Sequence, residues 1–438
     1  MLKTPLNIQK LQRKLYCKAK QTSDFRFYAL YDKVYRIDIL THAYNLVKHN
    51  RGAPGIDGVS YVDIEKYGVE NYIKELSQEL KAKEYKPNAI KRVYIPKSNG
   101  QKRPLGIPTL KDRIVQMATK IVIEPIYEAD FEPNSYGFRP KRNAHQAMDD
   151  IAKNLVYGHT TVIDADLSQY FDTISHKQLL SLVAKRVVDK NILSLIKQWL
   201  KAPIVEELGN GKRRYTKNHT HGTPQGGVIS PLLANIYLDV LDTYWKQKDM
   251  FERYGAKIVR YADDFVILCK NPFNHNQILN EVKVLLDSLE LKLNSQKTSI
   301  VDAKQESFGF LGFTITIKVN PKTGKRFPLI VPSAKAEVNF KEKIKSLTGR
   351  NMLPSKIEDI ISKVNRVARG WRNYFYYGNC SKSMHKMDNY LQSRVRIFLR
   401  RKHRVQTIGY KRFPTEFLHN KLGLYKIPAQ APWSMSRK

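Results

Sequence analysis

Two short runs of β-prone residues, 257–260 and 265–268, flank the sequence Tyr261-Ala-Asp-Asp264. β-branched and aromatic residues favour strands, and a short polar connection between two such runs predicts a β-hairpin. Two adjacent carboxylates, those of Asp263 and Asp264, then lie in an exposed turn. Two adjacent aspartates are also common in ordinary turns, so this hairpin constrains the fold more than it defines a function.

A second strand supplies a third carboxylate. The apolar residues of 162–165 predict a buried strand that carries Asp164 and ends near Asp166. We therefore expect Asp166 to converge with Asp263 and Asp264 in one cleft, and Asp164 is an outside candidate. Carboxylate oxygens without nearby Cys or His clusters suit Mg²⁺ rather than zinc. Two such ions are what phosphodiester formation on a 3′-hydroxyl requires.

The chain is strongly basic along its whole length. Its 438 residues include 76 Lys and Arg against 40 Asp and Glu, a net charge of +36. Such a surface binds polyanions, and nucleic acid is the natural candidate because neutralised phosphates release counterions. A merely solvated basic surface and acidic membrane lipid are the alternatives. No apolar run is long enough to span a bilayer and no signal peptide is evident, so we expect a cytoplasmic protein without a membrane partner.

Helices and strands alternate along the first three quarters of the chain. Residues 93–95 and 105–107 predict two strands whose connecting loop presents Lys97 and Arg103. Residues 175–200 predict one long helix, because apolar residues recur at helical spacing from end to end.

From Ser333 onwards the pattern is helical and more basic, with arginines interleaved among aromatic residues. This combination suits phosphate contacts together with stacking on unpaired bases, whereas a solvated basic helix face is the alternative. The candidate RNA-binding residues are Arg369, Trp371, Arg372, Arg400 and Arg401.

Five motifs follow one another along the chain. They are Asp166-Leu-Ser-Gln-Tyr-Phe-Asp172, Gly222-Thr-Pro-Gln-Gly-Gly-Val-Ile-Ser-Pro-Leu-Leu-Ala-Asn235, Tyr261-Ala-Asp-Asp264, Leu293-Asn-Ser-Gln-Lys297 and Phe310-Leu-Gly-Phe313. In this order they resemble the reverse transcriptases encoded by group II introns. Residues 103–108 and 135–140 resemble that family's fingers region, and 52–60 its N-terminal extension. The similarity covers nearly the whole chain.

The resemblance implies an α+β fold of the right-hand polymerase type, with fingers, palm and a helical, basic thumb and maturase region. The expected boundaries are residues 1–60 for the N-terminal extension, 61–160 for the fingers with part of the palm, 161–332 for the palm with the reverse transcriptase motifs, and 333–438 for the thumb and maturase RNA-binding region. The chain resembles the members that lack a C-terminal endonuclease domain.

The same resemblance assigns roles at the polymerase site. Asp166, Asp263 and Asp264 are implied as ligands of two Mg²⁺ ions, with Mn²⁺ as an alternative metal. Lys97 and Arg103 are implied to contact the triphosphate of the incoming nucleotide.

Four further assignments follow from the resemblance. Gln225 and Lys297 are implied as secondary substrate contacts. Phe171 is implied as an aromatic gate beneath the sugar, where its ring would exclude a 2′-hydroxyl; the alternative is a core aromatic beside Tyr170. The turn made by Phe310, Leu311, Gly312 and Phe313 is implied to grip the primer.

The expected activity is therefore RNA-directed DNA synthesis from the 3′-hydroxyl of a DNA or RNA primer, with deoxynucleotide triphosphates as substrates. The expected partner is group II intron RNA, bound in a ribonucleoprotein that assists splicing and mobility. Three alternatives remain open: the same enzyme recruited to host defence, a CRISPR locus or DNA repair; a non-catalytic RNA-binding splicing factor; and an RNA-dependent RNA polymerase, against which Phe171 is the main argument.

Overall fold

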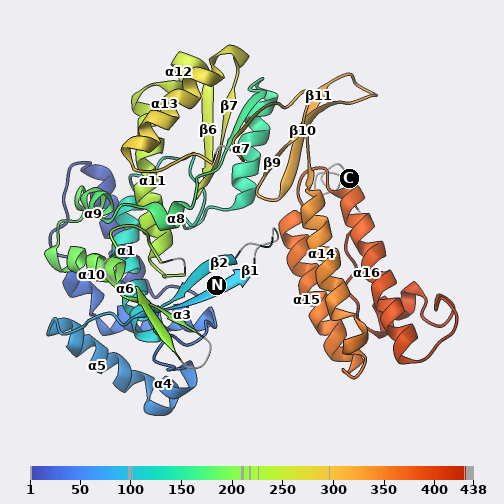
Figure 1. Cartoon of the computed structure of the whole chain (residues 1–438), viewed down its shortest axis with the longest axis horizontal. Helices are drawn as coiled ribbons and strands as arrows, with labels where there is room; N and C mark the ends of the chain where they lie inside the picture. The colour runs from blue at the N-terminus through green and yellow to red at the C-terminus, as the bar shows by residue number, and fades with distance from the viewer. Residues whose placement is uncertain are drawn as a thin grey trace. The chain divides into compact units, whose positions relative to one another are not determined.

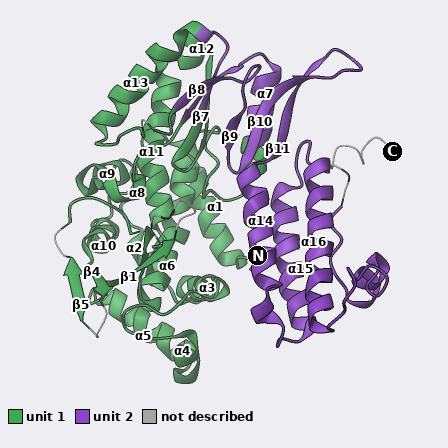
Figure 2. Cartoon of the chain, turned by 45° about the vertical axis from the view of Figure 1, so that its right-hand side comes forward, with its two compact units in different colours: residues 1–147, 165–265, 273–298 green, residues 148–164, 266–272, 299–438 purple. Residues whose placement is uncertain are grey.

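The computed structural model describes residues 2–96, 100, 102–208, 212–216, 219–224, 226–294, 296–428 and 430. The chain divides into two compact units, coloured separately in Figure 2. Unit 1 comprises Met1–Ala147, Ala165–Phe265 and Phe273–Thr298, and unit 2 comprises Met148–Asp164, Val266–Pro272 and Ser299–Lys438. The carboxylates of Asp166, Asp263 and Asp264 all belong to unit 1. The predicted domain boundaries stay a prediction.

Helices dominate unit 1. They are α1 (Leu6–Gln21), α2 (Tyr31–Val34), α3 (Ile37–His49), α4 (Tyr61–Tyr67), α5 (Val69–Lys81), α6 (Leu110–Glu128), α8 (Tyr170–Thr173), α9 (His176–Ala184), α10 (Lys190–Lys201), α11 (Ser230–Gln247), α12 (Met250–Tyr254) and α13 (His275–Ser288), with the short 3₁₀ helix η2 (Pro272–Asn274) just before α13. Helix α6 is buried on nearly all sides, and α1 and α3 pack against it. No helix in the described part of the chain is both long and apolar enough to cross a membrane.

Arg103 lies on a strand of the first sheet. Its strands are β1 (Ile90–Pro96), β2 (Lys102–Ile107), β4 (Ile204–Glu207) and β5 (Arg213–Thr216), in the order β2-β1-β4-β5. The prediction of two strands around 93–95 and 105–107 is confirmed, since β1 and β2 pair antiparallel with Val93 opposite Leu105. The prediction that Arg103 lies in the connecting loop is wrong, because Arg103 belongs to β2 and pairs with Ile95.

A second sheet carries the three candidate carboxylates at the ends of its strands. It contains β6 (Ala256–Tyr261), β7 (Asp264–Cys269), β3 (Thr161–Ala165) and β8 (Ser299–Asp302), in the order β6-β7-β3-β8. Strands β7 and β3 are almost entirely buried, as expected of central strands made from continuous apolar runs. Asp164 lies within β3, paired with Ser299 of β8.

Unit 2 contains a third sheet, which has three strands, and a group of helices. Its elements outside the second sheet are most of α7 (Ala144–Val156), β9 (Phe308–Phe310), β10 (Phe313–Val319), β11 (Arg326–Pro332), α14 (Ala334–Leu347), η3 (Arg350–Met352), α15 (Ile357–Phe375), α16 (Ser381–Lys402) and the short π-helix η4 (Phe417–Lys421). Figures 1 and 2 both show α14, α15 and α16 side by side. Their apolar faces form one core, which includes Phe340, Val364, Leu391 and Phe398.

The single long helix predicted over 175–200 is wrong. The chain leaves the helix after Ala184 and re-enters it at Lys190. Between these points Val187 pairs with Phe27, and the Asp189 carboxylate caps α10 by accepting from the backbone N–H groups of Asn191 and Ile192. Tertiary hydrogen bonds therefore override the apolar periodicity here.

Candidate active site

The Asp-Asp turn has the geometry of a tight two-residue hairpin. Strand β6 ends at Tyr261 and β7 begins at Asp264, so Ala262 and Asp263 make the turn. Ala262 has a φ of 59°, in the left-handed region that suits such turns. Asp264 is exposed and Asp263 is partly buried. The predicted hairpin is confirmed and Asp263 lies in its turn, but Asp264 is the first residue of β7, and only Asp264 is as exposed as predicted.

Asp166 lies just beyond the end of β3, where a neighbouring segment holds it. The backbone N–H of Asn294 donates to the Asp166 carbonyl at 2.8 Å, and the Asn294 side-chain amide lies 3.3 Å from Asp166 Oδ2. The Lys297 ammonium lies 2.6 Å from the same carboxylate oxygen. Of these two residues of the 293–297 motif, only Lys297 was selected from the sequence.

The charges of this region are coupled. Burial raises the pKa of Asp263, and the nearby Asp166 carboxylate raises it further, whereas Arg103 and Lys297 lower it. The pKa of Lys297 is raised mainly by its hydrogen bond to Asp166, and also by the negative charges of Asp264 and Asp263. One cationic position therefore lies within electrostatic reach of all three carboxylates.

These residues fit a hard divalent cation in their chemistry. Carboxylate oxygens are the ligands that Mg²⁺ prefers, and a cation would relieve the repulsion between Asp166 and Asp263. They do not form a ready-made cage, because the described part of the chain contains no group of three His, Cys, Asp or Glu side chains arranged to hold a metal ion. The Lys297 ammonium instead provides the positive charge beside Asp166.

The substrate-binding candidates are only partly described. Lys97 and Gln225 lie outside the described residues, whereas Arg103 is exposed on β2 and its charge acts on Asp263. Lys297 also contributes to this cationic surface. The structure thus brings Arg103 and Lys297 near the carboxylates from two separate segments, and their substrate roles stay predictions.

The loop that follows Gly222 is packed tightly between two elements of unit 1. A Cβ added to Gly226 would lie 2.4 Å from the Gly106 carbonyl oxygen of β2. On the other side, the Thr223 N–H donates to the Phe171 carbonyl at 2.7 Å. Close approach of this kind leaves no room for a side chain, which is why glycine occupies position 226.

Phe171 and its neighbour Tyr170 have different environments. Tyr170 is fully buried, and its hydroxyl donates to the Ala234 carbonyl at 2.6 Å. Phe171 is only partly buried, with its ring centroid 5.3 Å from that of Tyr170. Tyr170 thus occupies the core position, and part of the Phe171 ring stays accessible to a ligand, as the role of a gate requires.

The Phe310–Phe313 segment is a hairpin turn of unit 2. Leu311 and Gly312 both have positive φ, and Phe310 pairs with Phe313. Phe313 is fully buried among aromatic residues of α15, and the Tyr374 hydroxyl donates to the Leu311 carbonyl at 3.0 Å. The two phenylalanines are therefore core residues, and the Leu311-Gly312 tip is the part that a primer could contact.

The five candidate RNA-binding residues lie on two helices of unit 2. Arg369, Trp371 and Arg372 are on α15, and Arg400 and Arg401 are in the last turn of α16. The Arg372 guanidinium stacks 4.3 Å from the Tyr376 ring centroid. The Trp371 ring packs on core residues and its Nε1 donates to the Ala336 carbonyl at 3.3 Å, so it contributes to packing as well. Their contact with RNA stays a prediction.

Comparison with known families agrees with this arrangement. Residues 95–315 match the family "Reverse transcriptase (RNA-dependent DNA polymerase)", and residues 338–414 match the "Group II intron, maturase-specific domain". The second match covers α15, α16 and most of α14.

Two curated relatives are similar over most of this chain. Protein YkfC of Escherichia coli (strain K12) is 35% identical over 386 residues, which cover 80% of this chain and 99% of that protein. The group II intron-encoded protein LtrA of Lactococcus lactis subsp. cremoris is 32% identical over 374 residues, which cover 70% of this chain and 61% of LtrA.

Among solved structures, a chain of a "Partial Cas6-RT-Cas1–Cas2 complex" matches 59% of this chain and 42% of its own length, at 24% identity and a TM-score of 0.36. The α+β architecture with a helical, basic C-terminal region is the one expected of a right-hand polymerase. This chain belongs to the reverse transcriptase family, as an RNA-directed DNA polymerase of the type that group II introns encode, with a maturase-specific domain in its C-terminal helices.

Proposed function

We propose that this chain copies RNA into DNA from the 3′-hydroxyl of a DNA or RNA primer, at a site where Asp166, Asp263 and Asp264 hold two Mg²⁺ ions. One observation carries the proposal. The Lys297 ammonium is bound by Asp166, and the charges of Asp263 and Asp264 act on it as well, so one cationic position lies within electrostatic reach of three carboxylates. Mn²⁺, which takes similar oxygen ligands, is expected to substitute.

Each residue of the site has a part in this reaction. The metal ions, when bound, would activate the primer hydroxyl and neutralise the departing pyrophosphate. Arg103 and Lys297 supply fixed positive charge for the triphosphate of a deoxynucleotide, and Lys97 and Gln225 belong to the same proposal. Phe171 selects against ribonucleotides because its ring occupies the space that a 2′-hydroxyl needs.

Primer extension on an RNA template with Mg²⁺ and labelled deoxynucleotides tests the proposal. Asp263→Ala should abolish extension, because one of the three proposed metal ligands is lost. Asp287→Ala is a matched control, since Asp287 is an exposed carboxylate on α13 and should leave extension unchanged. Equal extension by the native protein and Asp263→Ala would rule out this metal site.

We propose further that the protein acts in the cytoplasm as a maturase, which binds group II intron RNA as a ribonucleoprotein and assists splicing and mobility. The match over residues 338–414 supports this role, as do the arginines of α15 and α16. Arginine–aromatic surfaces of this kind suit phosphate contacts together with base stacking.

Splicing of a group II intron RNA at limiting Mg²⁺ separates this role from the polymerase. Asp263→Ala should still bind the RNA and stimulate splicing, because the substitution leaves the helices of unit 2 intact. Replacement of Arg369, Arg372, Arg400 and Arg401 by Gln should weaken RNA binding and reduce its dependence on salt, since about one counterion is released per phosphate contact. Unchanged binding by this variant would place the RNA surface elsewhere.

A further inference from the structure

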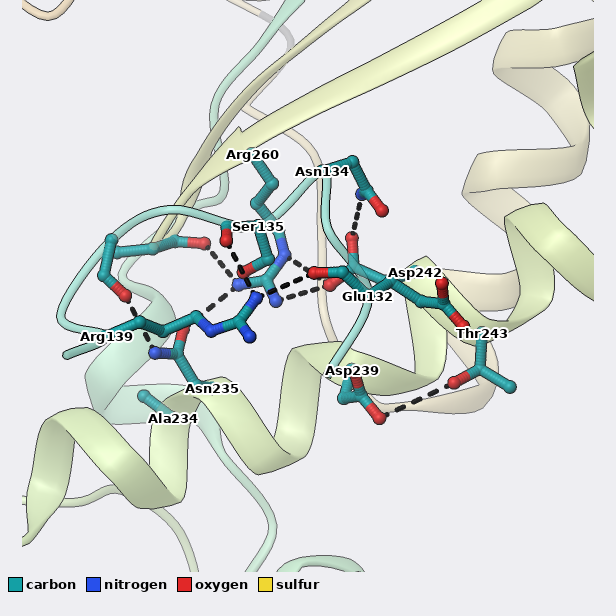
Figure 3. A network of polar contacts seen from close by, with 12 residues as sticks. Glu132, Asn134, Ser135, Arg139, Ala234, Asn235, Asp239, Asp242, Thr243 and Arg260 are labelled. Carbon is teal, nitrogen blue, oxygen red and sulfur yellow. Dashed lines mark hydrogen bonds and ion pairs between the residues drawn. The ribbon is translucent and has the colours of Figure 1, made fainter. Parts of the chain in front are cut away.

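A fully buried arginine lies directly behind the Asp-Asp turn. Arg260, the second-last residue of β6, has no exposed surface, and Figure 3 shows its guanidinium within a network of polar contacts. Its Nε donates to Asp242 Oδ2 at 2.8 Å, and Nη2 pairs with the same carboxylate. Its Nη1 donates to Asn235 Oδ1 at 3.2 Å and to the Ala262 carbonyl at 3.0 Å. Arg260 therefore connects helix α11 to the turn itself.

The two side chains that hold the guanidinium also bind the segment before Arg139. Asn235 and Asp242 are seven residues apart on α11, so they lie on the same face of the helix. Asn235 Nδ2 donates to the Gly137 carbonyl at 2.8 Å, and Asp242 Oδ1 accepts from Asn134 Nδ2 at 2.7 Å. Three separate stretches of the chain thus meet at one guanidinium.

Backbone contacts close the arrangement. The Arg260 N–H donates to the Asn134 carbonyl, and the Tyr136 N–H donates to the Arg260 carbonyl, each at 2.9 Å. A Cβ added to Gly137 would lie 2.4 Å from the Ala262 nitrogen, so this backbone touches the turn directly. The turn is enclosed by Gly137 on one side and fixed through Arg260 on another.

Stability alone does not require an arginine at this place. A buried ion pair must offset the desolvation of both charges, and its replacement by apolar side chains is often neutral or stabilising. What an apolar side chain cannot provide is the hydrogen bond to the Ala262 carbonyl. That carbonyl belongs to the peptide bond that leads into Asp263, so its orientation sets the direction in which the two carboxylates leave the turn.

We propose that Arg260 is a positioning residue for the polymerase: its guanidinium, held by Asp242 and Asn235, fixes the Ala262 peptide and thereby aims Asp263 and Asp264. The inference rests on the proposed function of these carboxylates as metal ligands. It gives the buried network a role in metal binding as well as in stability. Residues that orient metal ligands in this way commonly change metal affinity or activity 10–100-fold.

Two substitutions separate positioning from stability. Arg260→Lys retains the charge opposite Asp242 but loses the planar fork that reaches the Ala262 carbonyl. Asn235→Ala removes one support of the guanidinium and leaves the Arg260–Asp242 ion pair in place. The matched control is Arg186→Lys, because Arg186 is also buried, pairs with Asp130 at 2.9 Å and donates to the Ala19 carbonyl at 2.8 Å, and both partners belong to segments other than the turn.

The measurements are the thermal midpoint, Mn²⁺ binding followed by electron paramagnetic resonance without nucleic acid, and primer extension as a function of Mg²⁺ concentration. All are made on the full chain, below the lowest unfolding temperature. Arg260→Lys and Asn235→Ala should weaken Mn²⁺ binding and raise the half-saturating Mg²⁺ concentration about tenfold, and should lower kcat by about 10- to 100-fold. The KM for deoxynucleotide should change much less. Arg186→Lys should lower the thermal midpoint without these effects.

The outcomes distinguish this inference from the proposed function. If Asp263→Ala abolishes Mn²⁺ binding and extension while Arg260→Lys and Asn235→Ala change only the thermal midpoint, the positioning role is wrong and the metal site stands. If Asp263→Ala itself retains Mn²⁺ binding and extension, the metal site is wrong and the positioning role falls with it. Loss of metal affinity in Arg186→Lys as well would show a general effect of instability and would overturn the inference.

Discussion

A partly buried carboxyl group on α11, that of Asp239, makes the stability of this enzyme depend on pH. Asp239 precedes Asp242 by one helical turn, and its Oδ1 is buried without a hydrogen-bond partner in the described structure. Its Oδ2 lies 3.5 Å from the Thr243 hydroxyl, at the edge of the network in Figure 3. The pKa of Asp239 is raised to about 7, mainly by burial and also by the charge of Asp242, while the charge of Arg260 acts to lower it.

The sign follows from comparing the folded and unfolded states. An unfolded Asp has a pKa of about 3.9, so between that value and about 7 the folded protein binds a proton that the unfolded chain has released. Stability therefore falls as pH rises through this window, and the loss is complete above about pH 7. From pH 5 to pH 8 about two pKa units are crossed, which corresponds to about 2–3 kcal/mol at 1.36 kcal/mol per unit.

The substitution Asp239→Asn removes the ionisation and nearly preserves the shape. The variant should not lose this stability as the pH rises. The difference between its thermal midpoint and that of the native protein should therefore increase by about 4–6 °C from pH 5 to pH 8, at about 2 °C per kcal/mol for a unit of this size. Any constant effect of the amide cancels in this comparison. The assay is differential scanning calorimetry at both pH values, with the exposed Asp287→Asn as control. An Asp239→Asn shift that is the same at pH 5 and pH 8 would refute the reasoning.

Three further substitutions test the substrate side of the site. Phe171→Ala should raise incorporation of ribonucleotides relative to deoxynucleotides by about tenfold or more, measured by single-nucleotide extension, and an unchanged ratio would remove Phe171 as the gate. Gly226→Ala should lower both the thermal midpoint and extension, because its φ is +112° and the new Cβ would meet the Gly106 carbonyl; Gly58→Ala, with φ +72° but open space around it, should show only backbone strain. Tyr374→Phe deletes the hydrogen bond to the Leu311 carbonyl, worth about 1 kcal/mol, and should raise the KM for primer several-fold without changing the KM for nucleotide; equal changes in both would contradict a role in gripping the primer.

Local interactions explain what the sequence could predict. The β6–β7 hairpin depends on two β-prone runs and a two-residue turn, and both are visible within twelve residues of sequence. The β1–β2 pairing is equally local. Asp166, at the end of a buried apolar run, followed from the same principle. These are the elements that deliver the carboxylates, so the two adjacent aspartates and their place in a hairpin were predictable.

Interactions between distant residues explain what the sequence could not predict. The break between α9 and α10 depends on Asp189, whose Oδ2 accepts from the backbone N–H groups of Leu30 and Tyr31, about 160 residues earlier in the chain. The apolar period across 175–200 contains no trace of that contact. An acidic residue before Lys190 is an N-cap signal, however, and could have indicated a helix start at this point.

The contacts that support the Asp-Asp turn also join residues that are distant in the sequence, so they could not be predicted either. Residues 135–140 and the Gly222–Asn235 motif were recognisable from the sequence, but nothing in either segment indicates that both adjoin the residue before Tyr261. The composition even predicts the opposite. In a chain with 76 basic residues, any one arginine is expected to be a solvated or RNA-binding side chain. Burial reverses that expectation: a guanidinium with no exposed surface must be bonded on several sides, and the groups that bond Arg260 include the peptide that leads into Asp263. Arg260 is therefore a basic residue that no nucleic acid can reach and that acts on the turn through a backbone peptide, whereas Lys297 contacts Asp166 directly.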